Sequence, residues 1–169
     1  MNPTAGTPRT LVRDLMTVGV MTCALDVPLQ QIARVMLDRD LEGVVVLDEE
    51  GHGVGIVTQD EVVRGYCHPR AEALTAQDVM REGVPELPPD IPLTAAAAMM
   101  QDMGLRVVFL LHNANGIIYP AAMLSYRHIL RHLAAEADDE LRDLGIDARR
   151  EAPHETFIRK RDAAKRQDP

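Results

Sequence analysis

The chain is poor in aromatic residues and in cysteine. Aromatic side chains make up 3% of its 169 residues and tryptophan is absent, which argues against the base stacking that holds single-stranded nucleic acid. Cys23 and Cys67 lack the spacing of a metal or redox motif, and two cysteines do not make a disulfide framework. We therefore expect a reducing, cytoplasmic setting. Cys67, beside His68, is expected to be a free and inert thiol, with redox sensing as the alternative.

Long apolar runs are absent as well. The longest strongly apolar stretch, residues 117–124, includes Tyr119 and Pro120 and is far shorter than the roughly 18 residues that a membrane helix needs. Residues 1–10 are polar and lack the apolar core of a secretion signal. No membrane partner is expected.

The charge is negative and uneven. The formal net charge is -8 and the isoelectric point is about 5.2, which disfavours binding of polyanions over the whole surface. Residues 149–169 hold seven Lys or Arg against four Asp or Glu, so this tail carries +3 and the rest carries -11. The composition, 46% hydrophobic and 26% charged, is otherwise that of a soluble globular protein. Nucleic acid is not expected as a partner.

What the sequence does contain is a repeat of itself. At least eleven positions carry the same residue at an offset of 64, and after a three-residue insertion the offset becomes 67. The repeat is longer than the commoner solenoid units of roughly 20 to 50 residues, which predicts two small α/β modules. Packed modules leave clefts between them, where ligands tend to bind. The matched pairs include Asp14 and Asp78, Met16 and Met80, Val20 and Val84, Asp26 and Asp90, Pro28 and Pro92, Leu29 and Leu93, Ala33 and Ala97, Met36 and Met100, Leu41 and Leu105, Val44 and Val108, and Leu47 and Leu111.

Each copy predicts a strand, a helix, two strands and a helix after a short opening turn. Asp26 and Asp90 are expected as the N-caps of the first helices, each with a proline in the first turn. Pro120 indicates an edge or a bulge where the insertion can be absorbed. In the first copy, one apolar helix face is expected from Leu29, Ile32, Ala33, Met36 and Leu37. The other expected ranges are 10–16 and 75–80 for the opening turns, 18–22 and 84–87 for extended stretches, 43–47 and 107–111 for buried strands, 48–51 and 112–116 for hairpin turns, 54–57 and 123–124 for returning strands, and 58 and 125 for helix starts.

This order of elements resembles the cystathionine-β-synthase (CBS) domain. The resemblance is carried by Asp14-Leu-Met16, by Asp26-x-Pro28, by Leu41-Glu-Gly43 before Val44-Val-Val-Leu-Asp48, and by Gly55-Ile-Val-Thr58. Two such domains in tandem resemble the Bateman module, a regulatory unit that in many relatives binds adenosine-containing nucleotides. The implied fold is α/β (α+β), with pseudo-symmetric repeats at 10–66 and 75–133 and a C-terminal helical extension at 134–169.

The candidate ligand site follows the returning strand of each copy. In the family a hydroxyl residue there, and an aspartate three residues later, resemble a grip on ribose and phosphate. Thr58 and Glu61 hold these positions in the first copy, with Asp60 as a substitute, and Ser125 and His128 hold them in the second. The same Thr-x-x-Glu pattern is also a capping box, in which the two side chains satisfy the helix's own backbone donors. Both interpretations stay open.

Basic residues near the second copy offer further contacts. Arg106 and Arg127 are candidate partners for a phosphate, because guanidinium groups match its geometry, and the alternative is plain solvation. His128 and His132 have the spacing of helix-borne metal ligands, but no glutamate of an HExxH motif lies between them, and no metal is expected. The sequence lacks the GxSxG, Walker, Rossmann and CxxC patterns, so we expect neither an enzyme nor a covalent cofactor.

The interpretation that follows is a non-catalytic sensor. It would bind AMP, ADP, ATP or S-adenosylmethionine in a cleft between the repeats and signal to an unknown regulated protein, as a homodimer of the kind the family often forms. One alternative is an interaction scaffold with vestigial clefts that acts through its C-terminal helices. Another is a nucleic-acid-binding regulator that uses the basic groups of residues 149–169.

Overall fold

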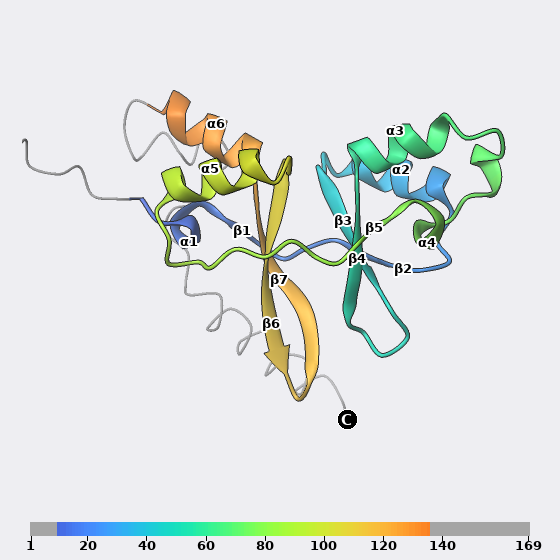
Figure 1. The fold of residues 1–169 in the computed structure, drawn as a ribbon, viewed down its shortest axis with the longest axis horizontal. Helices are drawn as coiled ribbons and strands as arrows, with labels where there is room; N and C mark the ends of the chain where they lie inside the picture. The colour runs from blue at the N-terminus through green and yellow to red at the C-terminus, as the bar shows by residue number, and fades with distance from the viewer. Residues whose placement is uncertain (1–9, 136–169) are drawn as a thin grey trace, which may run out of the picture.

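The computed structural model describes residues 10–135 of the chain. Within that range the two copies form two α/β units side by side, each with a sheet and a pair of helices at its upper end (Figure 1). The predicted helices of residues 134–169 lie outside the described part, apart from the last residue of α6 and the one after it. The repeats, their element order and the α+β class are confirmed.

The first unit contains a four-stranded sheet with the order β2-β3-β4-β5, and the second a three-stranded sheet with the order β1-β7-β6. Strands β2 and β3 run parallel, and the remaining neighbours are antiparallel. The elements are α1 Val12–Leu15, β1 Thr17–Val18, β2 Thr22–Ala24, α2 Leu29–Asp38, β3 Gly43–Leu47, β4 Gly53–Thr58, α3 Gln59–Tyr66, the 3₁₀ turn η1 Ala71–Ala73, α4 Ala76–Val79, β5 Arg81–Glu82, α5 Leu93–Asp102, β6 Val107–Ala114, β7 Ile117–Ser125 and α6 Tyr126–Ala134.

The opening segments of the two copies are exchanged. Strand β1, which opens the first copy, pairs with β7 of the second, and β5, which opens the second copy, pairs with β4 of the first. The short helices α1 and α4 are exchanged together with these strands. Val12 and Leu15 of α1 are buried in the core of the second unit, and Ala76 of α4 is buried in that of the first. Each unit is therefore completed by the other copy.

A third apolar cluster joins the units. Val45 and Ile56 from the first sheet pack with Val107, Phe109 and Met123 from the second, and all five are buried. Side chains in such a cluster leave water only when both units are folded and docked, so their burial couples the stability of the two copies. The continuous apolar runs in β3 and β6 have cover on both faces for this reason.

The three-residue insertion lengthens the second hairpin. Each hairpin has a register shift at the equivalent place, after Val46 in β3 and after Leu110 in β6. Beyond that bulge the second hairpin continues to a tight turn at Asn115 and Gly116, which both have positive φ (54° and 85°). Pro120 lies next to the bulge, as predicted. The predicted turn at 112–116 is shorter in the structure, because β6 continues to Ala114.

The predicted N-caps are wrong. Pro28 and Pro92 occupy the N-cap positions of α2 and α5, not Asp26 and Asp90. Pro28 has φ -60° and ψ 140°, and its carbonyl accepts hydrogen bonds from the next turn, including that from Ile32 N–H at 3.1 Å. Proline fits this extended entry because its fixed φ is already correct and it has no N–H to satisfy.

The apolar face predicted for α2 is also narrower than its spacing indicates. Leu29, Ile32 and Met36 are buried and Ala33 is half-buried, but Leu37 is 82% exposed. Leu37 lies one residue beyond the stripe that faces the sheet, so it points away from the core of this unit.

Candidate functional site

Helix α3 begins at the end of β4 with a capping box. The backbone N–H of Thr58 donates a hydrogen bond of 3.0 Å to Oε2 of Glu61, and the Thr58 hydroxyl donates to the same oxygen. Glu61 has no solvent exposure. The capping interpretation therefore describes the conformation of this pair, and the role of the pair in ligand binding stays a prediction.

The second carboxylate oxygen of Glu61 faces two arginines. Oε1 lies 3.3 Å from Nη2 of Arg81 on β5 and 3.5 Å from Nη2 of Arg64 on α3, and within the described residues it makes no hydrogen bond. Burial acts to raise the pKa of Glu61, but the hydrogen bonds from Thr58 and the charge of Arg81 outweigh it and hold the pKa below its ordinary value. Glu61 is thus a buried carboxylate with its negative charge balanced from the exchanged strand.

The second copy has the same geometry with different chemistry. The N–H of Ser125 donates a hydrogen bond of 3.1 Å to Nδ1 of His128, and Nε2 of His128 lies 2.7 Å from the Thr17 hydroxyl on β1. A ring nitrogen that accepts an N–H carries no proton, so the neutral ring bears its proton on Nε2 and donates it to Thr17. Thr17 corresponds to Arg81 at the 64-residue offset. Each cap residue therefore contacts the equivalent position of an exchanged strand.

The remaining predicted residues meet at the junction of the two units. Nε of Arg106 lies 4.0 Å from Oδ2 of Asp60, which joins the start of β6 to the first turn of α3. Arg127, in the first turn of α6, donates a hydrogen bond to Asp40 just after α2. That hydrogen bond lowers the pKa of Asp40 and raises the pKa of Arg127. Both pairs are exposed, and each takes its carboxylate from the first unit and its arginine from the second.

Sequence reasoning missed Arg81, Thr17 and Asp40. The first two lie in short exchanged strands, and local sequence gives no sign of which unit such a segment will join. The 64-residue offset relates them to each other, but only the tertiary pairing relates them to Glu61 and His128. Asp40 lies in a turn after α2, and its partner is far along the chain.

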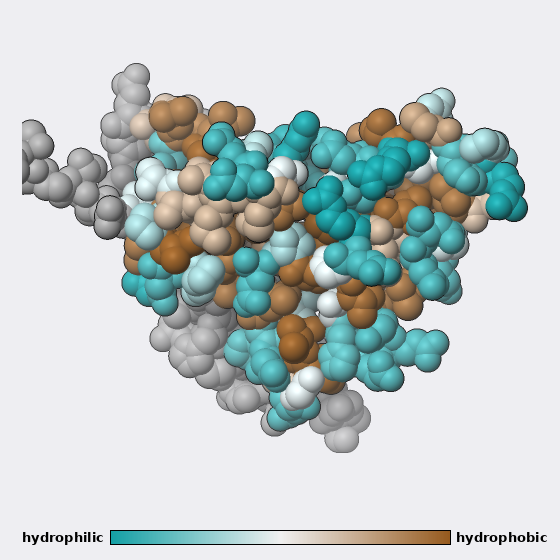
Figure 2. Space-filling model, viewed as in Figure 1, coloured by the Kyte–Doolittle hydropathy of each residue, from teal (hydrophilic) through white to brown (hydrophobic). Residues whose placement is uncertain are grey.

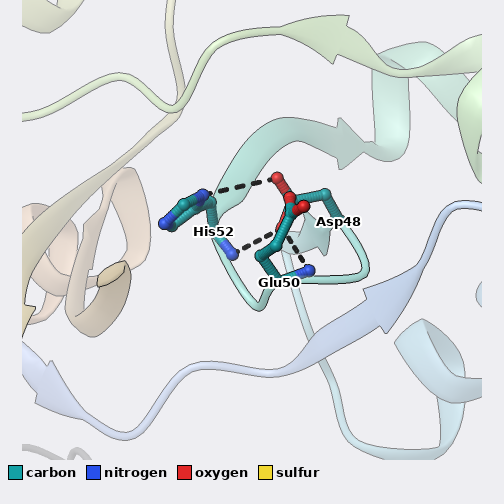
Figure 3. Close-up of side chains that lie close together, drawn as sticks. All are labelled: Asp48, Glu50 and His52. Carbon is teal, nitrogen blue, oxygen red and sulfur yellow. Dashed lines mark hydrogen bonds and ion pairs between the residues drawn. The ribbon is translucent and has the colours of Figure 1, made fainter. Parts of the chain in front are cut away.

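Among the described residues, one group has the donor types of a metal site. Oxygen and nitrogen atoms of Asp48, Glu50 and His52, in the turn between β3 and β4, lie within 4.8 Å of one another (Figure 3). Oδ1 of Asp48 accepts hydrogen bonds from the N–H groups of Glu50 and His52 at 3.1 and 2.8 Å. These bonds form an Asx turn, which gives Asp48 a structural role in the hairpin.

Hollows in the first unit lie near α2. One of about 470 Å³ is lined by Leu29, Ala33 and Tyr66 among others, and one of about 340 Å³ is lined by residues that include Leu37 and Asp40. A smaller one of about 160 Å³ lies between β2 and α2, beside Cys23. None of the three is lined by a residue of the Thr58 cap.

Comparison with solved structures identifies the same fold in several proteins. The CBS domain pair of protein MJ0100, in complex with 5′-methylthioadenosine and S-adenosyl-L-methionine, has a TM-score of 0.67 at 18% identity and covers 77% of this chain and 100% of that one. The CBS-domain containing protein ATU1752 from Agrobacterium tumefaciens has a TM-score of 0.65 at 21% identity, over 77% of this chain and 98% of that one. An uncharacterized conserved protein from Pyrococcus horikoshii has a TM-score of 0.64 at 15% identity, over 79% and 98%.

The sequence comparisons place the chain in a family. The magnesium transporter MgtE of Thermus thermophilus is 36% identical over 81 residues, which are 48% of this chain and 17% of that protein. Within residues 10–135, no helix combines the length and the hydropathy needed to cross a bilayer. The family model of the CBS domain matches twice, over residues 12–67 and 76–135. The chain therefore belongs to the CBS domain family, as a tandem pair.

Proposed function

We propose that this protein is a non-catalytic regulatory module that binds an adenosine-containing nucleotide between its two repeats and signals to a partner protein. The observation that carries the proposal is the tandem CBS pair itself, which shares its fold with a pair in complex with 5′-methylthioadenosine and S-adenosyl-L-methionine. In line with this, the helices α3 and α6 both begin beside an exchanged strand of the other copy.

The first cleft is the better candidate for the nucleotide. A helix N-terminus and a hydroxyl such as that of Thr58 suit phosphate oxygens, and a carboxylate can accept hydrogen bonds from both hydroxyls of a ribose. To do so, Glu61 exchanges its cap bonds with Thr58 for bonds to the ribose. In the second cleft His128 offers one acceptor nitrogen at most, so Ser125 and His128 are the weaker pair.

A ligand at Glu61 has a direct route to the other repeat. Arg81, whose guanidinium lies 3.3 Å from the Glu61 carboxylate, belongs to β5, and β5 continues into the second copy. A change in the position of Glu61 therefore disturbs the strand that leads from the first unit into the second, which shifts the population of the relative arrangements of the two units. The regulated protein would read that arrangement.

Calorimetric titration with AMP, ADP, ATP and S-adenosylmethionine tests the proposal. We expect one of the four to bind, and Thr58→Ala or Glu61→Gln to weaken that binding by about tenfold or more, since each removes a hydrogen bond to a polar ligand. Ser125→Ala, the equivalent change in the second copy, is the matched control and should leave the tightest site unchanged. The proposal fails if none of the four binds, or if both first-copy variants bind as the original chain does.

A second candidate is an interaction scaffold whose clefts hold no ligand. The observation that favours it is that both cap residues, Glu61 and His128, turn back onto their own helices. In that case, native mass spectrometry of the freshly purified protein should show only the mass of the polypeptide. A bound species with the mass of an adenosine compound would exclude the scaffold.

A further inference from the structure

Asp40 has a backbone conformation that aspartate rarely adopts. Its φ is 52°, in the left-handed region, where the equivalent residue of the second copy is Gly104 with φ 63°. Glycine is the usual residue at such a position after a helix, because it has no Cβ to clash. The first copy thus keeps a side chain where the second copy has none, at some expense in backbone strain.

The side chain of Asp40 has a specific partner in the other repeat. It accepts a hydrogen bond from Arg127 of α6, 87 residues along the chain. The charge of Arg131, one turn further along α6, acts on Asp40 as well, and that of Glu42 acts on Arg127. The carboxylate is therefore held at the junction by the basic start of α6.

A second pair crosses the same junction in the same sense. Arg106 faces Asp60 at 4.0 Å. Under the repeat, Arg106 corresponds to Glu42 at offset 64, and Asp60 corresponds to Arg127 at offset 67. At the positions equivalent to Asp60 and Arg106, the other copy therefore has Arg127 and Glu42. The acidic and basic residues are exchanged between these equivalent positions. The junction consequently has an acidic side from the first unit and a basic side from the second.

The position of the pairs matters for an anionic ligand. In the view of Figure 2, hydrophilic side chains gather at the junction between the two helical pairs. Arginine binds carboxylate and phosphate through the same planar array of N–H donors, so the two anions compete for it. Exposed ion pairs of this kind are weak, and a phosphate can displace the carboxylates.

We propose that Asp40 and Asp60 form an ionic latch with Arg127 and Arg106, which holds the two repeats together at their helical side and opens when a phosphate group takes the place of the carboxylates. In the latch, the carboxylates of Asp40 and Asp60 compete with the phosphate of the ligand for the two arginines. The latch rests on the proposed function only for the identity of that ligand.

The experiment compares anion binding by two double variants. Asp40→Asn with Asp60→Asn removes both carboxylates of the latch and keeps their size, and asparagine tolerates the left-handed conformation. Asp38→Asn with Asp102→Asn is the matched control, because it removes the same charge from exposed positions at the ends of α2 and α5. Both variants and the original chain are titrated with inorganic tripolyphosphate and with ADP. We expect the latch variant to bind about fivefold more tightly than the control.

The outcomes separate the latch from the proposed function. If ADP binds the original chain and the latch variant equally well, the latch is wrong and the nucleotide site stands. If tripolyphosphate binds the latch variant more tightly than the control while no adenosine compound binds at all, the latch stands and the nucleotide site is wrong. Equal or absent binding of tripolyphosphate by all three proteins overturns the latch.

A second variant tests the contribution of Asp40 alone. Asp40→Gly removes the carboxylate and at the same time relieves the left-handed strain, so this protein folds at least as readily as the original. We expect it to bind tripolyphosphate more tightly than the original chain does, in keeping with the double variant. Affinity unchanged from the original chain would exclude Asp40 from the latch.

Discussion

Glu61 is a carboxylate with no solvent exposure that stays charged because of its surroundings. Thr58 supplies hydrogen bonds to one oxygen and Arg81 supplies positive charge near the other. Removing such a side chain loses a helix cap, which is worth about 1 kcal/mol, and leaves Arg81 without its counter-charge. The residue thus contributes to stability whether or not it also contacts a ligand.

The pH dependence of that contribution can be predicted. The pKa of Glu61 is lowered from its ordinary 4.5, so the ionised carboxylate stabilises the folded state above about pH 4.5, and this contribution is lost as pH falls through the lower folded pKa. Glu61→Gln, which keeps the shape of the cap, should be less stable than the original chain by about 1 kcal/mol at pH 7.

Urea unfolding at a series of pH values measures the difference in unfolding free energy between Glu61→Gln and the original chain. The difference between the two proteins should shrink steadily below about pH 4.5, because the protonated acid resembles the amide. Asp78 caps α4 in the same way and its pKa is also lowered, so Asp78→Asn is a useful exposed comparison. A difference for Glu61→Gln that stays constant down to pH 3 would contradict the assigned ionisation.

For single residues, the sequence predicted where the candidate site residues lie along the chain, but not which residues from distant segments they contact. Thr58, Glu61, Ser125 and His128 lie at helix starts as expected, because a hydroxyl residue after a strand is a local signal. The N-cap prediction failed at Asp26 because the turn before α2 needs two more residues than the local pattern indicated. Partners from distant segments have no local signal at all.

At the scale of elements, the contact between β4 and β5 depends on a glycine. A Cβ at Gly55 would lie 2.7 Å from Sδ of Met80 and 2.8 Å from the carbonyl oxygen of Arg81. The second of these atoms is backbone and cannot rotate away. Gly55 therefore sets how closely the exchanged strand approaches.

We predict that Gly55→Ala destabilises the protein by about 1–3 kcal/mol, as overpacking does, and that it loosens β5. The equivalent residue in the second copy is Ala122, which pairs with Val18 of β1, so Ala122→Gly is the matched control and should cost about 1 kcal/mol or less. Thermal unfolding gives the stabilities, and hydrogen exchange reports on β5. If Gly55→Ala exchanged its β5 amides as slowly as the original chain does, the close approach would not be required.

The sequence predicted the longer helices and the hairpin strands of both units, because each has its own periodicity and the repeat supplies a second observation of each. The extended stretch expected at 84–87 is wrong as a strand, since β5 is Arg81–Glu82 and an isolated bridge from Glu86 to Phe109 follows it. The sequence also did not predict the exchange of β1 and β5. Strands of two residues carry no pattern that distinguishes one sheet edge from another, and only the closure of each apolar core decides between them. Leu37 shows the same limit, since helical spacing gives the face but not its width.

The whole molecule exposes large apolar side chains on its helices. Tyr66 and Leu133, which correspond under the 67-residue offset, are each 80% exposed at the ends of α3 and α6, and Leu130 is 64% exposed. Such positions are typical of an interface between subunits when they gather on one side. The homodimer stays a prediction, and these helices are its expected contact surface.

Sedimentation equilibrium tests the dimer. We expect about twice the chain mass of 18.7 kDa, and a monomer for Leu130→Glu with Leu133→Glu, because buried carboxylates oppose association. Ile118→Glu, at an exposed position on the second hairpin, is the control and should remain dimeric. A monomer at all concentrations for the original chain, or a dimer for the helix variant, would contradict the prediction.

Because the opening segments are exchanged, the bounds of the sequence repeats differ from the bounds of the compact units in the structure. The two copies in the sequence begin with α1 and with α4, but these segments belong in space to the other unit. Each compact unit therefore contains one strand that comes from the other copy. A fragment cut between the copies would retain an unpaired sheet edge and a segment with no core to join. Neither sequence copy is therefore a complete structural unit: the four-stranded sheet of the first unit needs β5 from the second copy, and the sheet of the second unit needs β1 from the first.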